Sequence, residues 1–194
     1  MKCVQRRVLS LVLGVIILFI GSRCVAAEYS LLSKGKYFTV YARSGADLSG
    51  MLNRLNYQEF ARFDALGGQG GDTFNPASIL AHTLDGIYQE VSDILGIRLS
   101  SYHGKIVFVS NQAEVSTMFY AYFGQDFPER SFYIHEKNTI YISEKDLSLG
   151  MLGHEIAHAV ISHYFVVPPT TKVQEVLAGY VEYNLRKASG TLPR

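Results

Sequence analysis

The most informative stretch of this chain is Met151-Leu152-Gly153-His154-Glu155-Ile156-Ala157-His158-Ala159-Val160-Ile161. Apart from the two histidines and the glutamate it is apolar or small, which predicts a buried helix over about 147–165. Residues four apart in a helix are rotated by only about 40° from each other, so His154 and His158 can bind one ion. Glu155 points to the side of this pair, where it can act as a general base without being a ligand.

A third ligand is needed, because a hydrolytic zinc site has three protein ligands and one open position. Glu175 lies 17 residues after His158, in a segment expected to be helical over 171–188. Pro168 and Pro169 break the chain between the two helices, so the second can fold back antiparallel and bring this carboxylate to the histidines. There are two simpler alternatives to a metal site. Glu175 is then a solvated carboxylate on the helix surface, and His154 and His158 are core histidines whose hydrogen bonds are satisfied.

These residues resemble the gluzincin zinc peptidases, especially the peptidase MA-like domains related to thermolysin and the aminopeptidases. The likeness covers about residues 104–188, where a strand, a helix and a hairpin precede the His-Glu-x-x-His helix. The resemblance implies a zinc-dependent peptidase that acts on a peptide or protein substrate. It implies His154, His158 and Glu175 as ligands of Zn²⁺ and Glu155 as the catalytic base.

The chain departs from the family pattern after the third ligand. Val176 stands where glycine is common, and Gly179 stands where an acidic residue often supports a histidine ligand. Glu182, one turn further on, is a possible substitute. Relatives often stabilise the oxyanion with a tyrosine or histidine, and the sequence does not separate the nearby candidates Tyr164, Tyr180 and Tyr183. As an equivalent edge strand does in related peptidases, the strand at 139–142 is expected to pair with an extended substrate.

The rest of the chain alternates between strand-like and helix-like segments. Runs rich in β-branched and aromatic residues predict strands at 37–41 and 106–109 and a hairpin of 132–135 with 139–142. Apolar spacing predicts helices at 46–63, 76–95 and 112–123. The expected fold is α+β: one small zincin-like domain in which a mixed or antiparallel sheet with an edge hairpin is followed by the motif helix and a C-terminal ligand helix.

Other chemistries find little support in the sequence. A metzincin needs glycine and histidine three and six residues after His158, where Ile161 and Tyr164 stand. No nucleophile-elbow string indicates a serine hydrolase. The glycine-rich segment 66–72 lacks the lysine and hydroxyl of a phosphate-binding loop and is expected to be a surface loop. Three histidines have no motif around them and are expected to be structural: His82, His103 and His135.

The amino terminus predicts a signal peptide over residues 1–27. Basic Lys2, Arg6 and Arg7 precede an uncharged run of 13 residues, and small residues end the segment at Val25-Ala26-Ala27. The run is shorter than the roughly 20 residues of a membrane-spanning helix, so cleavage is expected to leave a domain of 28–194. The protein is then exported, periplasmic or secreted, and membrane-anchored only if the segment is retained. A lipoprotein at Cys24 is disfavoured by the preceding arginine.

Removal of this segment changes the chemistry of the chain. Both cysteines, Cys3 and Cys24, lie within it, so the mature protein has no thiol for disulfides or cysteine catalysis. The segment carries four basic and no acidic residues, so its removal changes the net charge from +1 to −3. Such a charge disfavours nucleic acid as a partner. The rival to a peptidase is a non-catalytic exported scaffold or binding protein that retains the fold.

Overall fold

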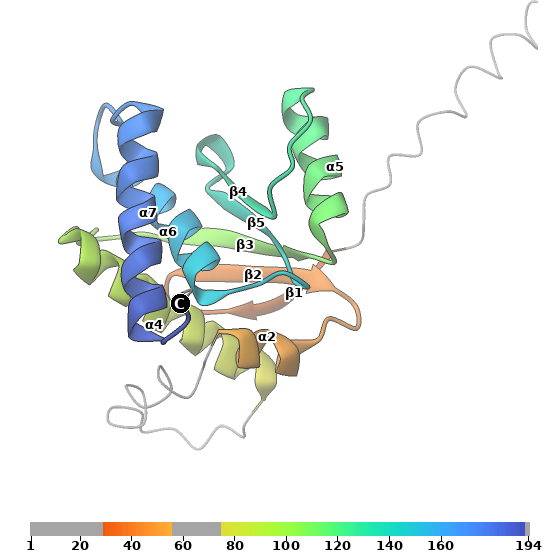
Figure 1. Ribbon diagram of the computed structural model, residues 1–194. Coiled ribbons are helices and arrows are strands. Elements are labelled where there is room, and N and C mark those ends of the chain that lie inside the picture. The colour runs from red at the N-terminus through yellow and green to blue at the C-terminus, as the bar shows by residue number, and fades with distance from the viewer. Residues whose placement is uncertain (1–28, 56–74, 193–194) are drawn as a thin grey trace, which may run out of the picture.

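Five strands form one open sheet in the computed structural model, which describes residues 29–55 and 75–192 (Figure 1). The predicted signal segment and the glycine-rich segment 66–72 lie outside the described residues. The spatial order is β1-β2-β3-β5-β4. The strands are β1 (Tyr29–Lys34), β2 (Phe38–Arg43), β3 (Gly104–Val109), β4 (Ser131–Ile134) and β5 (Thr139–Ser143).

The sheet is mixed, because its interior pairs are parallel and its two edge pairs are antiparallel. β2 pairs parallel with β3, and β3 pairs parallel with β5. β1 and β4 are the edges, each antiparallel to its neighbour. This corrects the expected role of 139–142: β5 is an interior strand, since Lys105–Val109 pairs with Thr139–Ser143 along its full length. The free edge next to the motif helix belongs to β4 instead.

The described residues form five α-helices, three of which pack directly on the sheet, while the other two pack mainly on those helices. The five helices are α2 (Leu48–Arg54), α4 (Pro76–Leu95), α5 (Gln112–Phe123), α6 (Leu149–Tyr164) and α7 (Thr171–Ala188). Figure 1 shows α4, α6 and α7 grouped together, while α5 stands apart across β4 and β5. Alternate strand residues follow this division: Ile106 and Phe108 join the main core with α4 and α6, and Val107 and Val109 pack with α5. The α+β fold class with its edge hairpin is thereby confirmed.

Most predicted elements appear with close boundaries, and local capping explains why. The side chain of Asn75 accepts from the Ala77 amide at 3.1 Å at the start of α4, and Gly96 ends that helix in the left-handed conformation at φ 66°. The helix expected at 46–63 is observed only as α2, and the rest of that range is largely outside the described residues. β1 was not predicted, and His135 begins a 3₁₀ turn instead of ending β4.

Two glycines let α6 and α7 approach closely in antiparallel orientation. A Cβ atom on Gly153 would lie 2.1 Å from Cδ1 of Leu185, and one on Gly150 would lie 2.8 Å from Cγ of Arg186. Both distances are far below ordinary carbon contacts. The absence of these two side chains is what places the polar face of α7 against the histidines of α6.

Candidate metal centre

Helix α6 holds the two motif histidines at the boundary between core and cleft. It begins at Ser148, whose hydroxyl caps the Met151 amide at 3.3 Å, and most of its residues are buried. His154 and His158 lie on the remaining, partly exposed face. Their Nε2 atoms are 3.2 Å apart, as helical spacing predicts for two residues that share one ion.

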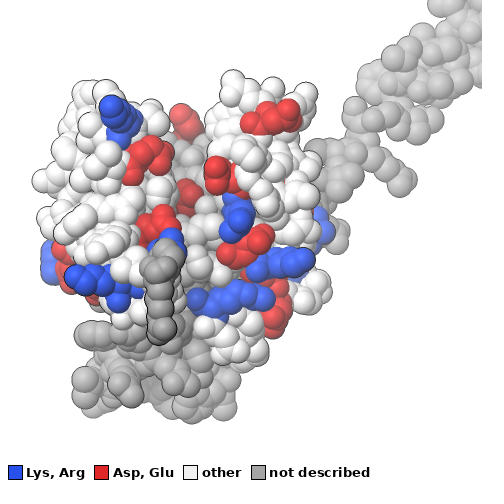
Figure 2. Space-filling view, viewed as in Figure 1, with Lys and Arg blue, Asp and Glu red and all other residues white. Residues whose placement is uncertain are grey.

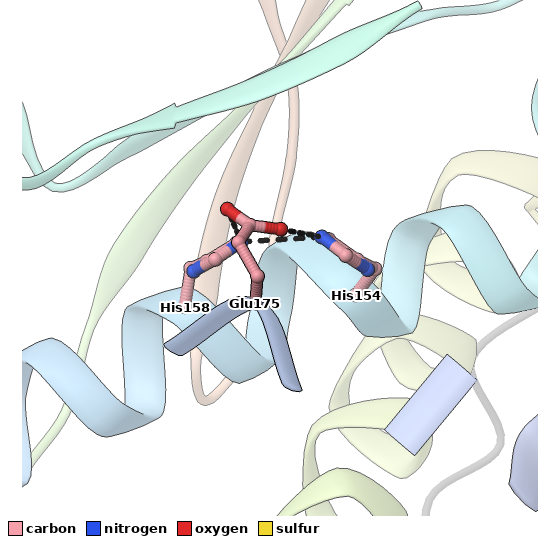
Figure 3. A group of neighbouring side chains, drawn as sticks. All are labelled: His154, His158 and Glu175. Carbon is pink, nitrogen blue, oxygen red and sulfur yellow. Dashed lines mark hydrogen bonds and ion pairs between the residues drawn. The ribbon is translucent and has the colours of Figure 1, made fainter. Parts of the chain in front are cut away.

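Helix α7 brings the carboxylate of Glu175 between these two rings (Figure 3). Oε2 lies 3.3 Å from Nε2 of His154, and Oε1 lies 3.4 Å from Nε2 of His158. Its side chain is 54% exposed, whereas those of the histidines are 22% and 15% exposed. The three residues that the sequence proposes as ligands therefore meet at one point, and the carboxylate is the most accessible of them.

The three distances are similar to those between neighbouring ligand atoms of a tetrahedral zinc ion. With bonds of about 2.0–2.1 Å to zinc, neighbouring ligand atoms of a tetrahedron lie about 3.3–3.4 Å apart. Here the two Nε2 atoms lie 3.2 Å apart, and each lies 3.3 or 3.4 Å from a different oxygen of the Glu175 carboxylate. Two imidazoles and one carboxylate also leave a fourth position open. Within residues 29–55 and 75–192, no other group of three or more histidine, cysteine or acidic side chains is arranged to hold a metal.

The protonation of His158 also favours a metal. Burial lowers the pKa of its imidazole, and the neighbouring His154 lowers it further. Glu175 and a hydrogen bond with Gln174 act in the opposite direction without outweighing burial. Gln174 is itself held by the loop, since its amide nitrogen donates to the Pro169 carbonyl at 2.8 Å. The ring is therefore kept neutral, which is the form that binds a metal ion.

The outer nitrogen of His154 faces a second carboxylate on α7. Nδ1 is buried without a hydrogen-bond partner among the described residues, and Oε2 of Glu182 lies 3.4 Å away, at ion-pair distance. The other oxygen of Glu182 pairs with Arg186 at 3.2 Å. Gly150 leaves room for both side chains, because a Cβ atom there would lie 2.8 Å from Cγ of Arg186 and 3.1 Å from Cγ of Glu182. Glu182 thus lies on the outer side of the His154 ring, about one turn beyond Gly179 on α7.

Glu155 is the most deeply buried acid of the site, with 6% of its surface exposed. Its Oε1 accepts a hydrogen bond of 2.7 Å from the hydroxyl of Ser131. Burial raises the pKa of its carboxyl to about 7, and the charges of Glu175, Glu129 and Glu182 add to this, whereas the Ser131 bond lowers it. A carboxyl of this kind both accepts and donates protons near neutral pH.

A cleft of about 1430 Å³ opens over these residues, between α6 and α7 on one side and β4 on the other. Figure 2 shows the hollow on this face of the molecule, with acidic side chains around it. None of the tyrosines considered for the oxyanion lines it: Tyr164, Tyr180 and Tyr183 are each more than half exposed elsewhere. The lining does include Tyr133 and His135, at the end of the edge strand.

Sequence reasoning missed three residues of this cleft. Ser131 and Gln174 each bond a motif residue, and His135, expected to be structural, lines the wall. Ser131 immediately precedes the predicted hairpin strand 132–135, and nothing in the sequence says which face of that strand meets the motif helix. Gln174 directly precedes Glu175 in the chain. Once Glu175 is placed beside the histidines, the hydrogen bond of Gln174 with His158 can be expected.

Comparisons of the chain with protein-family models, with curated proteins and with solved structures give no match. Among the helices that the structure describes, none is both long and apolar enough to cross a membrane.

Proposed function

We propose that this protein is an exported zinc peptidase of the gluzincin type. The observation that carries the proposal is the ligand triangle, the group formed by the side chains of His154, His158 and Glu175, whose possible ligand atoms lie close enough together to hold one metal ion. Support also comes from Glu155, a buried carboxyl beside this triangle that lines the same cleft. A structural zinc site has four protein ligands and no open position, and it needs no cleft above the metal. The three ligands and the cleft here therefore favour a catalytic site.

The residues divide the work of amide hydrolysis between them. A zinc ion held by the three ligands would polarise the scissile carbonyl and activate the attacking water. Glu155 takes a proton from that water and passes it to the nitrogen of the leaving amine. Glu182, whose Oε2 lies 3.4 Å from Nδ1 of His154, would steady this ring so that Nε2 keeps its direction toward the cleft.

The substrate is proposed to bind as an extended chain along β4. This strand has a free edge among the described residues and its residues Ser131, Phe132 and Tyr133 line the cleft. An exposed strand edge offers unpaired amide and carbonyl groups to a peptide backbone. Such pairing would fix the peptide over the ligand triangle with little dependence on its side chains.

The test combines metal analysis with a single substitution. The mature protein, purified from periplasm or medium, should have the mass of residues 28–194 and bind one zinc per chain. Glu155→Gln should keep the zinc and lose peptide hydrolysis, because an amide of the same size accepts no proton. Glu90→Gln, an exposed position on α4, serves as control.

Three results would each contradict a part of the proposal. Less than about a tenth of an equivalent of zinc after incubation with the metal would rule out a zinc peptidase. Full zinc binding with no hydrolysis by the parent protein would favour a non-catalytic scaffold that retains the metal. A mass that includes residues 1–27 would indicate a membrane anchor.

A further inference from the structure

The hydroxyl of Ser131 is buried in the fold and points at the buried carboxyl of the motif helix. Ser131 is the first residue of β4, and 6% of its surface is exposed. Its backbone pairs with Ile142 of β5, while the next residue, Phe132, packs into the apolar cluster on the opposite face of the sheet. The alternation of the strand therefore directs Ser131 toward α6.

The bond leaves the two oxygens of Glu155 in different environments. Oε1 accepts from Ser131 at 2.7 Å, and this is the one side-chain hydrogen bond that Glu155 makes within the part of the chain that the structure describes. Glu155 also lines the cleft. Oε2 is therefore the oxygen available to water and substrate, while Oε1 fixes the rotation of the carboxyl group about its last bond, which is otherwise soft.

We propose that Ser131 is the positioning residue of the general base Glu155. Its hydrogen bond connects the base to β4, the strand proposed to receive the substrate. The inference rests on the proposed function. Among the described residues, Ser131 makes no side-chain hydrogen bond with His154, His158 or Glu175, and it acts through Glu155. Because Ser131 belongs to β4, the strand proposed to receive the peptide also sets the rotation of the carboxyl group of the base.

The kinetic test removes the hydroxyl and then restores it. Ser131→Ala is expected to keep one zinc per chain and the parent melting temperature, to lower kcat by about 10- to 100-fold, and to change KM little, since a small misplacement of a reacting group has this cost. Ser131→Thr should recover most of kcat. Ser143→Ala is the matched control: it removes another buried hydroxyl of the same hairpin, bonded to Asp146 at 2.6 Å, and should leave kcat unchanged.

A second readout requires no turnover and separates this inference from the proposed function. The ¹³C resonance of the Glu155 side-chain carboxyl, assigned through Glu155→Gln, should move in zinc-loaded Ser131→Ala and stay in place in Ser143→Ala. An unmoved resonance, or a kcat within about twofold of the parent, would overturn the positioning role. So would a joint loss of zinc, stability and kcat that Ser131→Thr does not restore. An inactive parent whose carboxyl resonance moves as expected would count against the peptidase alone.

Discussion

The two helices of the candidate site differ in how the fold holds them. α6 is buried over most of its surface, and its histidines and base project from a helix that the core fixes. α7 is buried along Ala178, Val181 and Leu185 and exposes most of its other residues. The proposed base and two of the proposed ligands are therefore fixed by the core, while the third proposed ligand depends on how one amphipathic helix docks. Substitutions on α7 should therefore alter the site with the least damage to the core.

The largest effect is expected where α7 contributes its ligand. Glu175→Ala should weaken zinc binding by more than about 100-fold, the upper end for changes in groups that only support a ligand. The fold should persist, because this side chain is half exposed. Zinc titration against a competing chelator measures the loss, and the unfolding midpoint of the metal-free protein is the control. Unchanged affinity would place the third ligand elsewhere, with Glu182 as the next candidate.

The same contrast explains what the sequence could predict. The four-residue spacing of His154 and His158 is a local property of a helix, so their meeting follows from the sequence alone. Glu175 needed one further step, the fold-back at two prolines, and the structure brings it to 3.3 and 3.4 Å from the histidines. The position of Glu182 beside Nδ1 could only be suggested, because it depends on the close helix approach that Gly150 and Gly153 allow.

The contacts between the sheet and α6 could not be predicted from the sequence, because they depend on non-local strand pairing. The hairpin was predicted, yet which of its strands is the edge depends on pairing with β3, some thirty residues earlier in the chain. A hairpin pattern carries no information about that non-local pair. The edge of the sheet was therefore expected at 139–142, whereas the structure has it at Ser131–Ile134. The bond from Ser131 to Glu155 was missed with it, since it follows from the same pairing.

An intermediate effect is expected at the outer carboxylate of α7. Glu182→Gln should weaken zinc binding by about 10- to 100-fold, because an amide supports His154 less well than a charged oxygen does. Competition with a chelator gives the value, and Glu90→Gln on α4 controls for the loss of one negative charge. A variant that binds zinc like the parent would mean that Glu182 serves only its ion pair with Arg186.

The smallest effect concerns two helical glycines that differ in their surroundings. A Cβ on Gly153 would lie 2.1 Å from Leu185, whereas one on Gly179 would meet nothing within 4 Å. Gly153→Ala should lower the free energy of unfolding by about 1–3 kcal/mol, as overpacking does, and weaken zinc binding by moving α7 away. Gly179→Ala should keep zinc and raise the free energy of unfolding by up to about 1 kcal/mol, because alanine favours the helix.

Denaturant unfolding of the metal-free and zinc-loaded forms of both variants tests the pair. The zinc-loaded form should separate them further than the metal-free form, since only Gly153→Ala disturbs the distance between α6 and Glu175. Equal stability and equal zinc affinity in the two variants would show that Leu185 swings aside at little cost. The position of α7 would then be set by Ala178 and Val181, which are fully buried, and not by the glycines of α6.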